Sequence, residues 1–254
     1  MEERKKNPVG KPSSDMVFGI RPVLELIRAG KVFDKIFIQK NLSGDLAKEF
    51  LEELKGSGAN LNRVPIEKLN RLTRKNHQGV VGFVSPIDFA SIDNVIDESY
   101  QAGKDPFILV LDRVTDVRNF GAIVRTAECA GIDAIIIPTK GAAQISSDAM
   151  KTSAGALGHV AICRTKNLPA LLTSMKNQGL NLVACTEKTS DSIYEAGLNQ
   201  PLAVIMGSEE DGISQEILKL CDQRVAIPIK GKIESLNVST AAGIIIYEAL
   251  RQRL

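Results

Sequence analysis

The sequence predicts an α/β protein made of a small α/β domain followed by a larger domain built on a mostly parallel sheet. Short apolar runs of strand length alternate with amphipathic helical segments along the whole chain. In the second half these runs are nearly continuous in apolar residues, as is typical of strands buried on both faces by helices. A length of 254 residues is enough for two such domains.

The first domain is expected at residues 16–85, after a disordered basic tail at residues 1–15 that lacks apolar periodicity. Apolar residues at Leu46, Phe50 and Leu54 lie near helical spacing. The expected helices are Ile20–Ala29, Leu46–Lys55 and Glu67–Arg74, and the expected strands are Lys35–Gln39, Leu61–Val64 and Val80–Val84.

A linker is expected at residues 86–105, where Pro86, Gly103 and Pro106 interrupt or bound one weak helical stretch. Residues 106–254 then form the second domain. Its expected strands are Phe107–Leu111, Ala134–Ile137, Val160–Cys163, Leu182–Cys185, Leu202–Met206 and Val225–Ile227.

Composition narrows the class of protein. No apolar run approaches the length of a membrane span, and the four scattered cysteines form no C-x-x-C pair. We therefore expect a cytoplasmic protein with reduced thiols, no membrane association and no zinc site. Residues 1–75 hold 16 Lys/Arg against 10 Asp/Glu, whereas the remainder holds 16 against 20. This basic front half suits a polyanion partner or an ordinary lysine-rich surface.

The first polar cluster runs from Leu111 to Gly131, where an apolar strand is followed by a polar loop and a helix beginning near Asn119. Asn119 and Arg125 could both reach a ligand above the carboxyl end of the strand, where open α/β sheets bind ligands. Alternatively, Asn119 caps the helix and Arg125 lies on its solvated face.

The second cluster runs from Val204 to Ser214. Gly207 directly follows an apolar strand and would let backbone approach a ligand closely. Three carboxylates follow at residues 209–211. Acids are favourable at a helix start, and no histidine lies nearby to support a metal site.

The third cluster runs from Ile227 to Gly243, where a glycine-bearing loop leads through Ser235 and Asn237 into an apolar helix. Ser and Asn cap helix starts, which offer unpaired backbone N–H groups. The three clusters together predict a composite ligand site. Fingerprints for a Rossmann dinucleotide site, a P-loop and a hydrolase nucleophile elbow are absent from the sequence.

In this order and spacing, the clusters resemble the motifs of the SpoU-type RNA 2′-O-ribose methyltransferases of the SPOUT superfamily. The matching stretches are D-R-V-T-D-V-R-N-F-G-A-I-V-R-T-A, I-M-G-S-E-E-D-G-I-S and I-P-I-K-G-K-I-E-S-L-N-V-S-T-A-A-G. F-G-I-R-P-V-L-E-L and H-Q-G-V-V-G-F-V near the N-terminus resemble the substrate-binding domain of the ribosomal-RNA guanosine methylases in that family, a domain similar to ribosomal protein L30e.

The resemblance implies S-adenosylmethionine as cofactor, a trefoil knot in the C-terminal domain and a homodimer. It implies a C-terminal helix in the dimer interface, whereas the apolar sequence of that helix alone equally suits a buried core. By motif, Gly207, Ile227 and Leu236 bind the cofactor. The catalytic residues implied by motif are Asn119, Arg125, Glu209, Ser235 and Asn237.

The implied reaction is attack of a ribose 2′-oxygen on the sulfonium methyl. The family proposal makes Arg125 the general base, but guanidinium keeps its proton in proteins. We therefore expect Arg125 to clamp the target phosphate and stabilise the developing alkoxide. Further RNA contacts are expected from the basic N-terminal domain, His77, and the cations Arg113, Arg118, Lys230 and Lys232.

The resemblance favours a guanosine in large-subunit ribosomal RNA as the substrate. Transfer RNA is the alternative, because close relatives use the same catalytic domain. A non-catalytic RNA-binding assembly factor is the third possibility, although the intact motif residues favour an enzyme.

Overall fold

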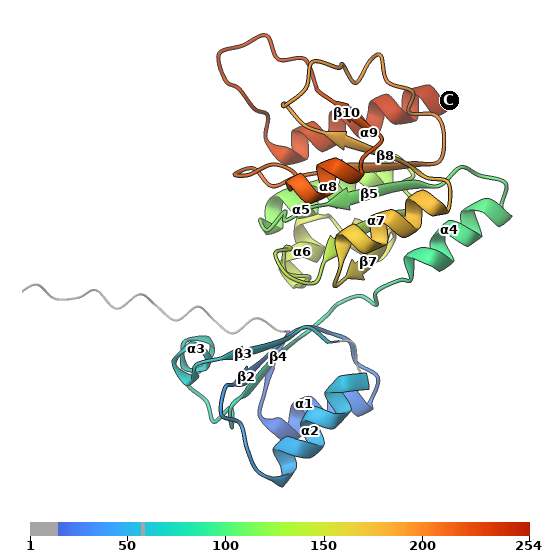
Figure 1. The fold of residues 1–254 in the computed structure, drawn as a ribbon. Coiled ribbons are helices and arrows are strands. Elements are labelled where there is room, and N and C mark those ends of the chain that lie inside the picture. Colours follow the sequence, from blue (N-terminus) through green and yellow to red (C-terminus); the bar gives the residue numbers. More distant parts are fainter. Residues whose placement is uncertain (1–14, 57–58) are drawn as a thin grey trace, which may run out of the picture. The chain divides into compact units, whose positions relative to one another are not determined.

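The computed structural model describes residues 15–56 and 59–254, which divide into two compact units (Figure 1). One unit extends to residue 87 and includes residues 145–147, and the other comprises residues 88–144 and 148–254. The tail expected at residues 1–15 lies outside the described residues except for Asp15.

The first unit is a mixed sheet with helices on both faces. Its elements are β1 (Met16–Phe18), α1 (Ile20–Arg28), β2 (Phe33–Gln39), α2 (Asp45–Gly56), β3 (Leu61–Val64), α3 (Ile66–Leu72) and β4 (Val80–Val84). The sheet order is β1-β4-β2-β3, with β4 antiparallel to β1 and β2, and β3 parallel to β2. Helices α1 and α2 share one apolar core with the sheet, and α3 packs against its other face. The three-residue strand β1 is too short to show alternation, so the sequence did not predict it.

The second unit is built on a six-stranded sheet in which every pairing is parallel. Its strands are β5 (Phe107–Leu111), β6 (Ala134–Pro138), β7 (Ala161–Thr165), β8 (Asn181–Cys185), β9 (Leu202–Met206) and β10 (Gln223–Val225). Its helices are α4 (Ile92–Gln101), α5 (Val117–Cys129), α6 (Ser147–Thr152), the 3₁₀ turn η1 (Ala156–Gly158), α7 (Leu168–Asn177), α8 (Gln215–Leu220) and α9 (Val238–Arg253).

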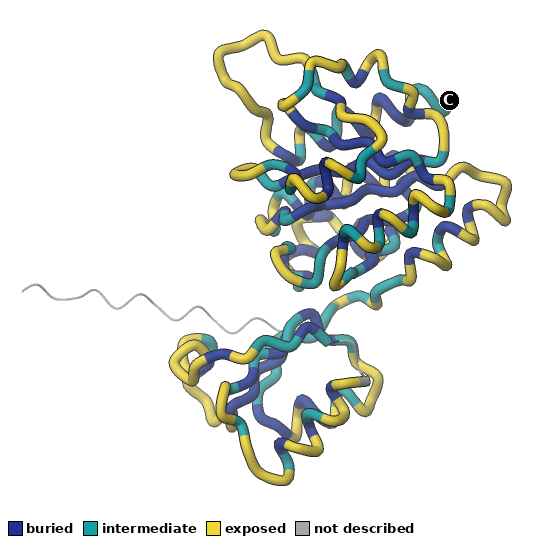
Figure 2. The backbone as a smooth tube through the Cα atoms, in the orientation of Figure 1, coloured by how far each residue is buried: buried dark blue, intermediate teal, exposed yellow. Residues whose placement is uncertain are grey.

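The strand order β10-β8-β9-β5-β6-β7 places β9 and β5 at the centre. Every residue of these two strands is buried, as the dark blue segments of Figure 2 show. The parallel sheet expected from continuous apolar runs is therefore confirmed, with each strand within about two residues of its expected bounds.

The structure differs from the expected linker at residues 86–105, because most of this segment belongs to the second unit. Helix α4 buries Ile92 and Ile96 in the same apolar cluster as Ile108 and Val110 of β5. The weak helical pattern therefore marks a helix packed into the core.

The helix expected to begin near Asn119 begins earlier, at Val117. The carboxylate of Asp116 caps it, because Asp116 Oδ1 accepts from the backbone N–H groups of Arg118 at 2.9 Å and Asn119 at 2.8 Å. Asn119 is therefore not the cap, and its side-chain amide is available for other contacts.

Candidate active site

The three polar clusters emerge from the carboxyl ends of strands in the same parallel sheet. Residues 112–116 follow β5, residues 207–214 follow β9, and residues 226–237 follow β10. Because parallel strands end at the same edge of a sheet, these loops converge there.

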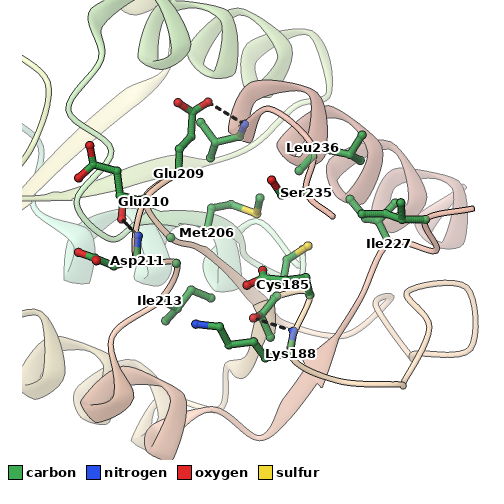
Figure 3. Close-up of a pocket in the computed structure, with 18 residues that line it drawn as sticks. Cys185, Lys188, Met206, Glu209, Glu210, Asp211, Ile213, Ile227, Ser235 and Leu236 are labelled. Atoms are coloured by element: carbon green, nitrogen blue, oxygen red, sulfur yellow. Dashed lines mark hydrogen bonds between the residues drawn. The ribbon is translucent and has the colours of Figure 1, made fainter. Parts of the chain in front are cut away.

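A cavity of about 260 Å³ lies among the loops that follow β8, β9 and β10. It is lined by all three residues expected to bind the cofactor, Gly207, Ile227 and Leu236, and by Ser235. Figure 3 shows Ile227 and Leu236 on one side of this cavity and the acidic residues 209–211 on the other. The cavity therefore joins an apolar wall to an acidic one.

Gly207 has a clear steric reason for being glycine. A Cβ at this position would collide with the backbone of Gly212 and Ile213. The loop folds back on itself, because Ser208 N–H donates to the Gly212 carbonyl at 3.2 Å and Gly212 N–H donates to the Ser208 carbonyl at 3.0 Å. The loop at residues 208–212 is therefore tightly closed on the acidic side of the cavity.

Asn119, Glu209 and Asn237 meet in one hydrogen-bonded cluster, although they are far apart in the sequence. Asn119 Nδ2 donates to Glu209 Oε1 at 3.0 Å, and Asn237 Nδ2 donates to the same oxygen at 2.7 Å. Asn237 Nδ2 also lies 3.0 Å from Asn119 Oδ1. All three side chains remain partly or fully exposed, so a ligand could reach them.

Asn237 has a second role as the N-cap of α9. Its Oδ1 accepts from the backbone N–H groups of Ser239 at 3.0 Å and Thr240 at 3.3 Å. The cap and the polar cluster thus use opposite ends of the same amide, which fixes its orientation.

A second cavity, of about 420 Å³, adjoins this cluster. It is lined by Arg113, Asp116, Asn119 and Gly141, and it shares residues 208–211 and Val238 with the first cavity. The loop at residues 208–211 is therefore a wall common to both cavities.

Arg125 lies apart from this arrangement. It is exposed on α5 and lines neither cavity, and its side chain makes no hydrogen bond or ion pair with any described residue. A separation of six residues places Arg125 and Asn119 about 120° apart around the helix axis. Within one chain, the structure does not bring Arg125 to the polar cluster.

Among the cations expected to contact RNA, Arg118, Lys230 and Lys232 are exposed. Arg113 is instead paired internally with Asp112 and Asp211. The hydrogen bond that Arg113 donates to the Asp112 carboxylate is the main cause that raises the pKa of Arg113.

His77 does not face solvent, contrary to the expectation that it contacts RNA. It is buried, its Nδ1 accepts from Gly79 N–H at 3.0 Å, and its Nε2 lies 2.9 Å from Asn70 Oδ1. These contacts make His77 a structural residue that holds the loop before β4, because both ring nitrogens are occupied.

Nucleophilic and metal chemistry find little support in this cavity. Burial raises the pKa of the Cys185 thiol, which lines the cavity, to about 12. This thiol is therefore protonated near neutral pH and is a poor nucleophile or metal ligand. No cluster of three metal-ligating side chains occurs among the described residues.

The described helices are also too short or too polar to span a membrane.

Two residues that sequence reasoning missed support the site. Asp112 is buried directly after β5, and its Oδ2 accepts from Ser214 N–H at 2.8 Å. Asp116 caps α5. Asp112 directly follows the apolar strand β5, and this position could have identified it from the sequence. Asp116 directly precedes α5, where Asp is a favoured N-cap residue.

Comparisons with known proteins give the same assignment for both units. The SpoU rRNA Methylase family model matches residues 106–247. The model for RNA 2′-O ribose methyltransferase substrate binding matches residues 16–90. The 23S rRNA (guanosine-2′-O-)-methyltransferase RlmB of Photobacterium profundum is 33% identical over 243 residues, which cover 95% of this chain and 99% of that protein.

Solved structures share the fold. The SpoU methyltransferase AviRb of Streptomyces viridochromogenes, in complex with the cofactor AdoMet, aligns over 94% of this chain and 90% of its own, with a TM-score of 0.60 and 24% identity. The TrmH/SpoU tRNA modifying enzyme of A. aeolicus is 34% identical, covers 59% of this chain and 75% of its own, and has a TM-score of 0.54.

Proposed function

Because this chain belongs to the SpoU rRNA methylase family, we propose that it transfers a methyl group from S-adenosylmethionine to a ribose 2′-hydroxyl of RNA. The substrate we favour is a guanosine in large-subunit ribosomal RNA. The observation that carries the proposal is the Asn119–Glu209–Asn237 cluster, which shares the loop at residues 208–211 with the adjoining cavity.

The cavity suits S-adenosylmethionine in shape and charge. Ile227, Leu236 and the neutral Cys185 offer apolar contacts, and Gly207 lets the loop beside the cavity fold back tightly on itself. Four carboxylates line the cavity against a single lysine, Lys188. This excess of negative charge favours a cationic ligand, and the sulfonium of the cofactor supplies an activated methyl group.

The polar cluster would position the attacking ribose. Asn119 and Asn237 present amide groups beside the Glu209 carboxylate, and Ser235 lies on the wall of the same cavity. Holding the hydroxyl oxygen in line with the methyl carbon and sulfur could supply several kcal/mol of the rate enhancement. Glu209 is placed to accept a hydrogen bond from the 2′-hydroxyl.

Arg125 would complete the site across a homodimer interface. Arg125 neighbours Thr126, whose methyl group faces Gly243 of α9. On α9, near this contact between α5 and α9, Tyr247 is exposed and Ile244 is half-buried. A second protomer covering these apolar groups would lie next to the Arg125 guanidinium. We assign Arg125 to the RNA phosphate and the developing alkoxide, because guanidinium is an excellent phosphate ligand.

The remaining features follow from the family. We place RNA binding by an L30e-like domain at residues 16–85, supported by the basic charge of the front half. We also place a trefoil knot at the C-terminus, supported by the strand order β10-β8-β9, which takes the chain from β9 past β8 to the edge of the sheet. We also propose a cytoplasmic location, which the proposed action on ribosomal RNA supports.

Transfer of labelled methyl from S-adenosylmethionine to undermodified large-subunit RNA tests the function, with transfer RNA assayed in parallel. We expect labelling of ribosomal RNA and a loss of roughly 100-fold or more in Asn119→Ala. That substitution should leave folding intact, because Asp116 and not Asn119 caps α5.

Each alternative has its own outcome. Labelling of transfer RNA alone would move the substrate to the class named for the A. aeolicus relative. If neither RNA is labelled and titration detects no cofactor binding, the non-catalytic assembly factor becomes the better assignment.

A further inference from the structure

Arg113 has an unusual backbone conformation for its residue type. Its φ of 62° lies in the left-handed region, which is unfavourable for a residue with a Cβ. Such conformations persist where surrounding contacts hold them, and they concentrate at functional sites. The contacts of the Arg113 side chain therefore indicate what holds this conformation in place.

The guanidinium of Arg113 joins the loop after β5 to the loop after β9. Its Nε lies 3.2 Å from Asp112 Oδ1, its Nη1 donates to Asp211 Oδ2 at 3.0 Å, and its Nη2 donates to the Gly212 carbonyl at 3.0 Å. Asp112 is 4% exposed and also accepts from Ser214 N–H. One end of this network is thus anchored in buried structure.

The loop held by Arg113 is the wall shared by the two cavities. It pairs Ser208 with Gly212 and carries Glu209 to Asn119 and Asn237. Displacement of this loop would alter the cavity proposed for the cofactor and the cluster proposed for the ribose at the same time.

We propose that Arg113 is a positioning residue that holds the loop at residues 208–212 in the conformation that binds S-adenosylmethionine and presents Glu209. The proposal rests on the proposed function for the identity of the cofactor. An exposed Arg–Asp pair contributes little alone. Arg113, however, has three acceptors in a fork geometry, one of them on a buried carboxylate, and charge-assisted bonds of this kind are the stronger class.

The competing role for Arg113 is direct contact with an RNA phosphate. The two roles differ in what happens without RNA. A positioning residue changes cofactor affinity in the RNA-free protein, whereas a phosphate contact changes RNA affinity alone.

Cofactor binding to the full-length protein, measured by calorimetry without RNA, separates the two roles. Arg113→Gly and Arg113→Asn both suit a positive φ and remove the guanidinium. We expect each to raise the Kd for S-adenosylmethionine by roughly tenfold, with melting temperature within a few degrees of wild type. Arg113→Lys keeps the charge but lacks the fork, and its Kd should be intermediate.

Ala154→Gly is the matched control, because Ala154 is an exposed non-glycine residue with φ 51° outside both cavities. It relieves backbone strain without changing the contacts of Arg113 with Asp211 and Gly212, so its cofactor Kd should equal that of wild type. Hydrogen exchange provides a second readout: Arg113→Gly should lose protection at the amides of Ser208 and Gly212, and Ala154→Gly should not.

Unchanged cofactor affinity in Arg113→Gly and Arg113→Asn, with unchanged exchange in Arg113→Gly, would overturn the proposal. A loss confined to RNA affinity would assign Arg113 to phosphate contact. If the wild-type protein fails to bind S-adenosylmethionine, the cofactor assignment fails. Hydrogen exchange at residues 208–212 would then show by itself whether Arg113 holds this loop in place.

Discussion

At the scale of single residues, Asn237 has two structural roles, helix capping and hydrogen bonding to Glu209, which substitution can separate. Its Oδ1 caps α9, and its Nδ2 donates to Glu209. Asn237→Ala removes both and should lower the free energy of unfolding by about 1 kcal/mol together with activity. Asn237→Ser keeps a capping oxygen but loses the amide donor, so we expect near-wild-type stability by urea denaturation and methyl transfer reduced roughly tenfold or more. Full activity in the Ser variant would mean that capping is the sole role of Asn237.

The family motifs implied that Asn119, Glu209 and Asn237 share one catalytic site, and the structure brings their side chains together. Their catalytic role stays a prediction. Sequence reasoning treated Arg113 as an RNA contact. Its pairing with Asp211, 98 residues away, depends on loop geometry that no local pattern encodes.

At the scale of elements, the predictable parts are those with a strong hydrophobic pattern. The fully apolar β5 and β9 matched their expected bounds. Both strands are completely buried, so their apolar runs contain no polar residue and their ends are easy to locate in the sequence. Helix α4 was mistaken for a linker because a narrow apolar stripe, chiefly Ile92 and Ile96, suffices to dock it. The three-residue strand β1 pairs with β4 through backbone bonds, which side-chain periodicity does not report.

The C-terminal end of α9 is held by a pH-dependent network. Glu248 is buried and accepts from Arg251 and Gln252, and the hydrogen bond from Arg251 is the main cause that lowers the Glu248 pKa from 4.5 to about 2. Because the folded pKa is the lower one, this stability is present above the unfolded pKa of 4.5 and is lost as pH falls toward 2.

Glu248→Gln should therefore be less stable than wild type at pH 7, by about 1–2 kcal/mol after allowance for the exposure of Arg251. The difference between the two proteins should shrink steadily between pH 5 and pH 2. Urea denaturation of both proteins across this range measures it. A difference that stays constant with pH would show that the ionisation of Glu248 does not stabilise the helix end.

At the scale of the whole molecule, the proposed active site lacks one of its predicted residues, Arg125, within a single chain. Asn119 lines the second cavity, whereas Arg125, on the same helix, is exposed and lines neither of the two cavities described above. A homodimer that covers α5 and α9 would bring a second chain beside each Arg125. Each site would then combine Asn119 of one protomer with Arg125 of the other, an arrangement that the sequence of one chain cannot reveal.

Subunit complementation tests this arrangement. Asn119→Ala and Arg125→Ala should each lose most activity when purified alone. If Arg125 acts across the interface, a mixed dimer contains one site with both substitutions and one site with neither. Random exchange of equal amounts makes half of the dimers mixed, so methyl transfer should recover to about a quarter of the wild-type rate. If both residues act within one protomer, every site in the mixed dimer stays defective and mixing restores nothing. Mass spectrometry of the intact dimers after exchange establishes that mixed dimers formed, so an inactive mixture that contains them assigns Arg125 to its own chain.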